Sequence, residues 1–197
     1  MNRSTTESEC LGPDIPKPLG TQLKLVLGLD SRPQTFSDWV DALAYIAERN
    51  DIEVGIDMLC TTEESPHKAR FDGGTEYYQC VLDPIIVPFL AEGVDTVEIE
   101  TQSPVSEKTI ELTVTETGVE ASPTDAVFSF GVDANVEGPP EHGVNPIFAY
   151  GIFCPYGNAF ASYEEYEEWA DGVDAITMAT DMDTAIEWAR AIGRVAH

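Results

Sequence analysis

Apolar residues recur along the chain with two different spacings. Where they return every third or fourth position, they lie on one face of a helix. A polar residue that can cap the first turn, or a proline within that turn, marks where such a helix begins. These signals predict a helix over residues 36–50, one that starts with Asp83 as N-cap and stops at Gly93, one that opens at Ser162, and a last one over residues 181–195.

Where apolar and polar residues alternate, the pattern predicts strands with one buried face. The turn signal Asp72-Gly73-Gly74 predicts a hairpin across residues 70–79. Further strands are expected over residues 52–58, 94–100, 109–115, 126–132, 147–153 and 174–180. The strands that look antiparallel cluster in the middle of the chain, with helices at both ends. The expected fold class is therefore α+β, with mainly antiparallel sheets flanked by short helices.

The charge of the chain restricts the partners that it can bind. Its 197 residues contain 36 Asp and Glu against 10 Lys and Arg, for a formal net charge of −26. No basic surface is available to displace counterions from a nucleic acid, and an anionic membrane would repel the chain. The acidic residues occur in every segment, which resembles proteins of extreme halophiles, where molar salt screens the self-repulsion. An ordinary acidic soluble protein is the plainer alternative.

No segment resembles a secretory signal or a membrane span. Residues 1–14 are polar, and the longest mostly apolar run, residues 81–91, is too short to cross a bilayer. We therefore expect a cytoplasmic protein whose cysteines are thiols rather than disulfides. Residues 1–19 are rich in Ser, Thr, Pro and Gly and are predicted to be a flexible tail. The chain has four cysteines: Cys10 in that tail, Cys60, Cys80 and Cys154.

The cysteines outside the tail are the first candidates for chemistry. Cys80 and Asp83 stand three positions apart at a predicted helix start, so one turn would let them share a proton or a metal ion. The helix N-terminus would also lower the pKa of the Cys80 thiol. A small core cysteine beside an N-cap aspartate explains the same spacing and is favoured on spacing alone. Cys154 ends a predicted strand, and Cys60 with His67 offers only two metal ligands.

Two longer motifs surround these residues. The first is an aromatic-x-Cys-x-Leu-Asp pattern followed by an apolar stretch with a proline, from Tyr78 to Pro88. The second is Phe-Cys, then Phe-Ala-Ser and an acidic helix with Trp-Ala, starting at Phe153. In this order the motifs resemble those of the alkylmercury lyases, or organomercurial lyases, over about residues 70–193. The chain departs from the family at Pro155-Tyr156-Gly157 and in a lengthened loop over residues 133–146.

The resemblance implies an enzyme that protonates the carbon–mercury bond and releases a hydrocarbon and Hg(II). Cys80 and Cys154 match the two mercury-binding cysteines, and Asp83 matches the residue that handles the proton. Thiolate is the soft ligand that suits a soft metal, and one aspartate can act first as general base and then as general acid. The resemblance implies no cofactor. It also implies that external thiols remove Hg(II) and that a mercuric reductase receives it.

The resemblance further divides the chain. Residues 59–197 would form the catalytic domain, and residues 20–58 a reduced counterpart of a winged-helix-like N-terminal domain, behind the tail of residues 1–19. The alternative function is a non-catalytic protein that binds Cu(I) or Hg(II) on the same fold, because a cysteine pair also suits Cu(I). A thiol-dependent binding module for another ligand is a third possibility. Asp83 favours the enzyme, since metal storage needs no proton donor. The preferred organic group, the oligomeric state and a role for Cys60 are left open.

Overall fold

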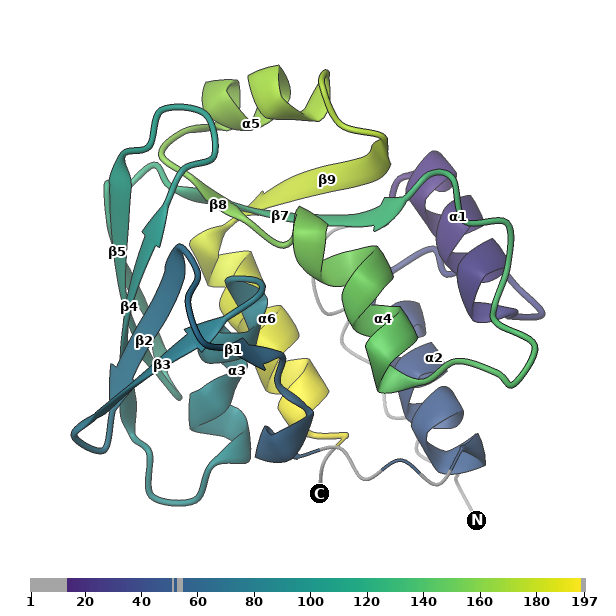
Figure 1. Ribbon diagram of the computed structural model, residues 1–197, viewed down its shortest axis with the longest axis horizontal. Helices are drawn as coiled ribbons and strands as arrows, with labels where there is room; N and C mark the ends of the chain where they lie inside the picture. Colours follow the sequence, from purple (N-terminus) through teal and green to yellow (C-terminus); the bar gives the residue numbers. More distant parts are fainter. Residues whose placement is uncertain (1–13, 51, 53–54, 196–197) are drawn as a thin grey trace, which may run out of the picture.

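The computed structural model describes residues 14–50, 52 and 55–195, and in it two antiparallel sheets pack against helices (Figure 1). The α+β class is confirmed. The larger sheet has the strand order β1-β3-β2-β4-β5-β6 and the smaller one the order β8-β7-β9. The strands are β1 Thr61–Thr62, β2 His67–Phe71, β3 Gly74–Tyr78, β4 Thr96–Gln102, β5 Thr109–Thr115, β6 Gly118–Ser122, β7 Val127–Asp133, β8 Ala159–Phe160 and β9 Ala175–Asp181.

Helix α6 runs through the middle of the molecule, beside α3 and against the smaller sheet (Figure 1). The ring of Trp188 on α6 stacks on Phe36 of α2, with centroids 4.1 Å apart, so the N-terminal helices share one hydrophobic core with the sheets. The helices are α1 Lys17–Leu27, α2 Phe36–Arg49, α3 Leu82–Leu90, α4 Pro146–Phe153, α5 Tyr163–Ala170 and α6 Met182–Gly193, with short 3-10 turns η1 Ile56–Met58 and η2 Cys154–Tyr156. Among the described residues, no helix has the length and apolar character needed to span a bilayer.

Local signals explain the elements that the sequence predicts well. The side chain of Thr35 accepts a hydrogen bond from the backbone N–H of Asp38, whose carboxylate accepts one from Thr35 in return, and this capping box opens α2. The hairpin of β2 and β3 turns at Asp72 and Gly73, which have φ values of 49° and 73°. Alternation in β4 and β5 buries facing residues such as Ile99 and Leu112. The helix over residues 36–50, the hairpin, these strands and the last helix are confirmed.

Three predicted elements are wrong in the described residues. The tail ends earlier than residue 19, because α1 begins at Lys17 and Leu19 is fully buried. The strand over residues 52–58 is not formed where the structure describes it, since Ile56–Met58 is a 3-10 turn. The strand over residues 147–153 is the helix α4, opened by Asn145, whose side chain accepts a hydrogen bond from the N–H of Phe148. A short apolar run does not by itself distinguish a buried strand from a helix.

Smaller corrections concern element ends and one strand that the pattern did not predict. Helix α3 begins at Leu82 after Val81, so Asp83 lies inside its first turn and is not the N-cap. Strand β6 was not predicted, although it pairs with β5 along its whole length. The division of the chain into a catalytic domain and a reduced N-terminal domain stays a prediction. Cys10 and the rest of residues 1–13 lie outside the described residues.

Candidate functional site

Cys80 lies at the crossing from strand β3 to helix α3, and its backbone is held from two sides. The N–H of Gln79, the residue before it, donates to the carbonyl of Cys60 at 2.9 Å. The N–H of Val81, the residue after it, donates to the carbonyl of Gly157 at 2.9 Å. These bonds fix Cys80 between the segment that carries Cys60 and the loop that follows Cys154.

Cys154 begins the 3-10 turn η2 directly after helix α4, and its side chain is buried. The turn closes with a hydrogen bond from the N–H of Gly157 to the carbonyl of Cys154 at 3.2 Å. A Cβ atom on Gly157 would stand 2.9 Å from the Cβ of Cys80, closer than side chains normally approach. The glycine therefore lets the loop carrying Cys154 come up against Cys80.

The structure brings together the three residues that the sequence singles out. One sulfur each from Cys80 and Cys154 and one carboxylate oxygen of Asp83 all lie within 4.8 Å of one another. Both cysteines are buried and Asp83 is partly buried. Two sulfurs at this separation suit a soft metal ion, and the carboxylate beside them can take up or give a proton.

Asp83 is positioned by a contact that is distant in the sequence. Its Oδ2 accepts a hydrogen bond from the backbone N–H of Cys60 at 2.9 Å, and the Cys80 thiol also hydrogen-bonds to its carboxylate. Burial raises the pKa of Asp83 to about 6, against the lowering effect of these two hydrogen bonds. Near neutral pH this carboxyl group can therefore both accept and release a proton.

The surroundings of Cys80 and Cys60 favour their protonated thiols. The pKa of Cys80 is raised well above its ordinary value, first by a hydrogen bond with Cys154, then by burial and by the negative charge of Asp83. The prediction that the helix N-terminus lowers this pKa is wrong, because these effects outweigh the helix. Burial raises the pKa of the Cys60 thiol to about 12, and the negative charges of Cys154 and Asp83 contribute to the same increase. A metal ion that binds here must displace thiol protons.

Cys60 belongs to the same buried cluster. It packs with Cys80 and Cys154, and the partly buried side chains of Leu82 and Tyr150 pack against this cluster. His67, suggested by the sequence as a second ligand beside Cys60, is buried, and its ring is hydrogen-bonded through Nδ1 to Thr101 Oγ1 at 2.7 Å.

Tyr150 is a site residue that the sequence reasoning missed. It stands on α4 four positions before Cys154, so a helical reading of this stretch would have placed both on one face. Its hydroxyl donates to the carbonyl of Met58 at 2.5 Å, which ties α4 to the turn η1 just before Cys60. Because the sequence pattern predicts a strand for residues 147–153, it does not place Tyr150 and Cys154 on one face.

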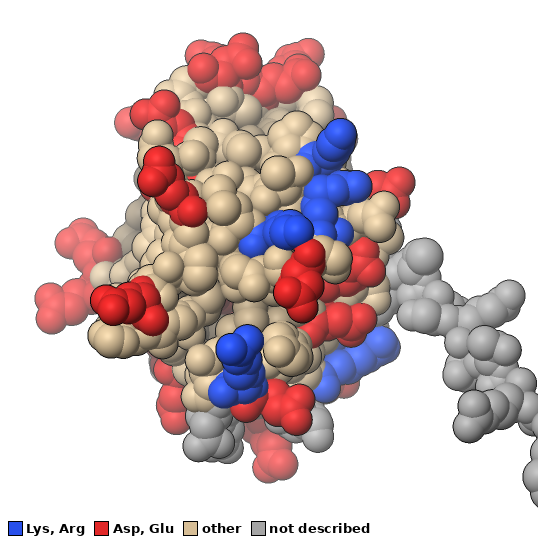
Figure 2. Space-filling model, turned by 90° about the vertical axis from the view of Figure 1, so that its right-hand side faces the viewer, with Lys and Arg blue, Asp and Glu red and all other residues tan. Residues whose placement is uncertain are grey.

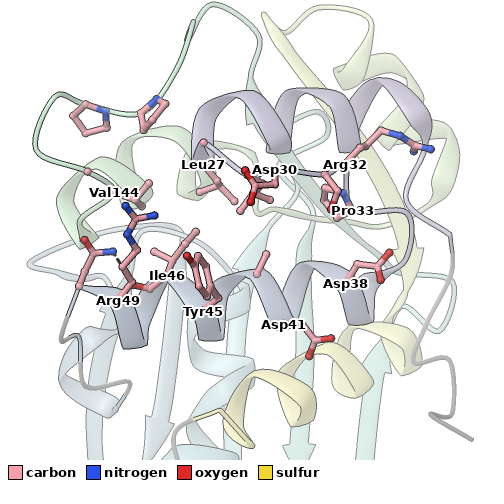
Figure 3. Close-up of a pocket in the computed structure, with 18 of the residues that line it drawn as sticks. Leu27, Asp30, Arg32, Pro33, Asp38, Asp41, Tyr45, Ile46, Arg49 and Val144 are labelled. Carbon is pink, nitrogen blue, oxygen red and sulfur yellow. Dashed lines mark hydrogen bonds between the residues drawn. The ribbon is translucent and has the colours of Figure 1, made fainter.

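A wide hollow lies away from these residues. Figure 3 shows it between α1, α2 and the loop of residues 139–144, with Asp41, Tyr45 and Arg49 of α2 along one wall. Its volume is about 970 Å³, and none of the three cysteines or Asp83 lines it. A smaller apolar cavity of about 150 Å³ is lined by residues that include Met58 and Ala149, and none of the three cysteines lines it.

Comparison with known proteins shows which family this chain, with its cluster of cysteines and Asp83, is similar to. A family model described as alkylmercury lyase matches residues 60–193, which include Cys60, Cys80, Asp83 and Cys154. The solved structure described as the mercury-bound form of MerB2 is similar in fold, with a TM-score of 0.51 and 13% sequence identity. That match covers 93% of each chain. No curated protein sequence matches this chain significantly.

Proposed function

Since this chain belongs to the alkylmercury lyase family and is an organomercurial lyase, we propose that its reaction takes place at Cys80, Cys154 and Asp83. The observation that supports this location is the meeting of two sulfurs and one carboxylate within 4.8 Å. The residues come from two segments that are far apart in the sequence, so only the folded chain forms the site. Metal storage, the alternative function, would not require the carboxylate.

The reaction begins with the exchange of ligands on mercury. The Cys80 thiol already hydrogen-bonds to Asp83, so the carboxylate can take its proton as the sulfur bonds to the mercury of R–Hg–X. The second thiol, Cys154, then adds its sulfur to the same metal. Of the two thiol protons, one leaves with the displaced ligand X⁻ and the other is held on Asp83.

Cleavage follows from the electron density that two thiolates place on mercury. The carbon bound to mercury becomes more basic, and Asp83 transfers its proton to that carbon as the carbon–mercury bond breaks. The products are RH and Hg(II) on two sulfurs, without any change in oxidation state. The raised pKa of Asp83 serves this step, because the proton that it takes from the thiol is held more firmly than on an ordinary aspartate until the carbon accepts it.

The substitution Asp83→Asn tests this assignment. Asparagine keeps the size of the side chain and an oxygen that can accept the N–H of Cys60, so the fold should persist. It cannot carry the proton, so release of benzene from phenylmercury should fall by a factor on the order of 10² or more. Gas chromatography measures the benzene, and thiol titration measures uptake of phenylmercury, which should stay near the parent value. Release at the parent rate would show that another group supplies the proton.

For the steps after cleavage, we propose that external thiols remove Hg(II) from the cysteines and that a mercuric reductase receives it. Both cysteines are buried, so external thiols must gain access to them before ligand exchange can occur. The reaction as written needs no cofactor, and free thiols are consistent with a cytoplasmic setting.

We also propose that the chain is adapted to molar salt. Among the described residues, ion pairs engage only the carboxylates of Glu100, Glu165 and Glu187. Figure 2 shows Asp and Glu spread over the face that carries α1 and α2 rather than gathered in one patch. Such unpaired charges repel one another unless salt shortens the screening length, to about 3 Å at 1 M.

This proposal predicts a stability that rises with ionic strength. The midpoint of thermal unfolding should increase steadily from low salt to molar KCl, because the net charge of −26 is progressively screened. Circular dichroism at each salt concentration measures the midpoint. A midpoint that does not depend on salt would contradict the halophilic interpretation.

A further inference from the structure

The reaction above uses two of the three buried cysteines and gives no task to the third. Resting on the proposed function, we propose that Cys60 is a third sulfur ligand, which binds the mercuric ion once the hydrocarbon has left. Cys60 packs in one cluster with Cys80 and Cys154. The product complex would then hold Hg(II) on three sulfurs rather than two.

The backbone of Cys60 is fixed to the site at both of its polar groups. Its N–H donates to Oδ2 of Asp83 at 2.9 Å, and its carbonyl accepts the N–H of Gln79 at 2.9 Å. Strand β1 continues this attachment, with Thr61 paired to Tyr78 of β3. Cys60 is therefore part of the framework that carries Cys80 and Asp83.

The sulfur of Cys60 lies next to one sulfur of the pair. It packs with Cys154 in the buried cluster, although Cys60 is not a member of the group whose ligand atoms all lie within 4.8 Å of one another. Sulfurs that share one metal ion at about 2.3 Å, the zinc–thiolate distance, stand about 4 Å apart. Cys60 packs in the same buried cluster, so its sulfur must approach the other two for all three to bind one ion.

The order of events follows from the coordination of mercury. While carbon is still bound, it occupies one of the positions around the metal between Cys80 and Cys154. Protonation removes the carbon as a hydrocarbon and opens that position. The S–H bond of Cys60 then breaks, a sulfur–mercury bond forms, and the proton passes to the carboxylate of Asp83, which has just given up its own. The complex gains one negative charge and no atom changes its oxidation state.

The number of sulfurs on mercury tests the proposal directly. The folded protein, in a Cys10→Ala background that leaves only the three buried cysteines, is turned over once with phenylmercury. X-ray absorption at the mercury edge should then show three sulfur neighbours, and titration should find all three thiols blocked. The same sample is assayed for benzene. Two sulfurs with Cys60 still titratable would overturn the proposal.

The variants Cys60→Ala and Cys60→Ser, in the same background, provide the matched comparison. After loading with Hg(II) alone, both should show two sulfur neighbours, and dithiothreitol should remove the metal at least about 10-fold faster than from the parent, the low end for losing a group that supports a metal site. Circular dichroism checks that each variant is folded. Equal removal rates would contradict a third ligand. If the parent holds mercury on three sulfurs but releases no benzene, the lyase assignment fails and the ligand assignment stands.

Discussion

Two segments of the chain carry the two mercury ligands of the proposed site. The sequence predicts the secondary structure of one of them much better than that of the other. The first cysteine segment, residues 74–90, runs from strand β3 through Cys80 and Asp83 into helix α3. The second cysteine segment, residues 146–157, runs from helix α4 through Cys154 to the turn at Gly157. The sequence pattern predicts the hairpin and the helix of the first segment, whereas for the second it predicts a strand where the structure has a helix. The two ligand positions therefore depend on different kinds of information.

The first cysteine segment is marked by local signals. A positive-φ turn at Asp72 and Gly73 directly precedes it, and a proline in the first turn of α3 limits where the helix begins. The second cysteine segment is a nearly continuous apolar run that offers no clear period. Of helix α4 only Ile152 is fully buried, and Ile147 is 81% exposed. The comparison shows that a continuous apolar stretch, such as the one that forms helix α4, need not be buried in the hydrophobic core when it lies beside a functional site.

The largest expected effects come from removing one ligand in each segment. Cys80→Ala and Cys154→Ala should each abolish release of a hydrocarbon from methyl- or phenylmercury, because each removes half of the thiolate pair that activates the bond. Gas chromatography of methane or benzene checks this. Cys10→Ala should leave turnover unchanged. If only one of the two segments proved necessary, the proposed pair would be wrong.

A smaller effect is expected where the two segments touch. In Gly157→Ala the new Cβ would meet the Cβ of Cys80 at 2.9 Å, so Cys80 or the loop must shift. The backbone at Gly157 has a φ of −94°, which suits any residue, so the contact itself is the obstacle. We expect a loss of about 10-fold or more in kcat/KM, since small displacements of reacting groups cost this much.

Gly151→Ala in helix α4 is the matched control for that substitution. Its Cβ would meet nothing within 4 Å, and alanine is the better helix former by up to about 1 kcal/mol. Activity should stay at the parent level, and thermal stability should be equal or slightly higher. Equal losses in both variants would mean that the second cysteine segment tolerates no change at all, and would remove the special role of the contact with Cys80.

The mildest test uses pH and concerns the first cysteine segment alone. With a pKa of about 6, Asp83 is protonated below that pH and cannot accept the proton of Cys80. We therefore expect kcat/KM to fall about 10-fold for each unit below pH 6, and to level off above it. Rates from pH 5 to 8 at constant ionic strength measure the inflection. In Asp83→Asn this inflection should vanish, and its persistence would assign it to another group.

The sequence predicted much of the fold where the signals were local. The helix over residues 36–50, the hairpin, strands β4 and β5 and the last helix follow from capping residues, turn glycines and alternation. The sequence missed strand β6 and the start of α1, and it mistook α4 for a strand. The site residues Cys80, Asp83 and Cys154 were singled out through a resemblance of motifs, because the spacing of Cys80 and Asp83 alone favoured an ordinary core cysteine.

The sequence by itself determined the ligand chemistry: two cysteines in recognisable motifs, an aspartate three residues after the first, and an excess of negative charge. Only the tertiary structure decided which groups meet. The approach of Cys154 to Cys80 depends on a loop without a side chain at Gly157, and the setting of Asp83 depends on the N–H of Cys60, 23 residues away. The pKa of Asp83 is likewise raised by burial, and burial is a property of neighbours that a linear pattern does not contain.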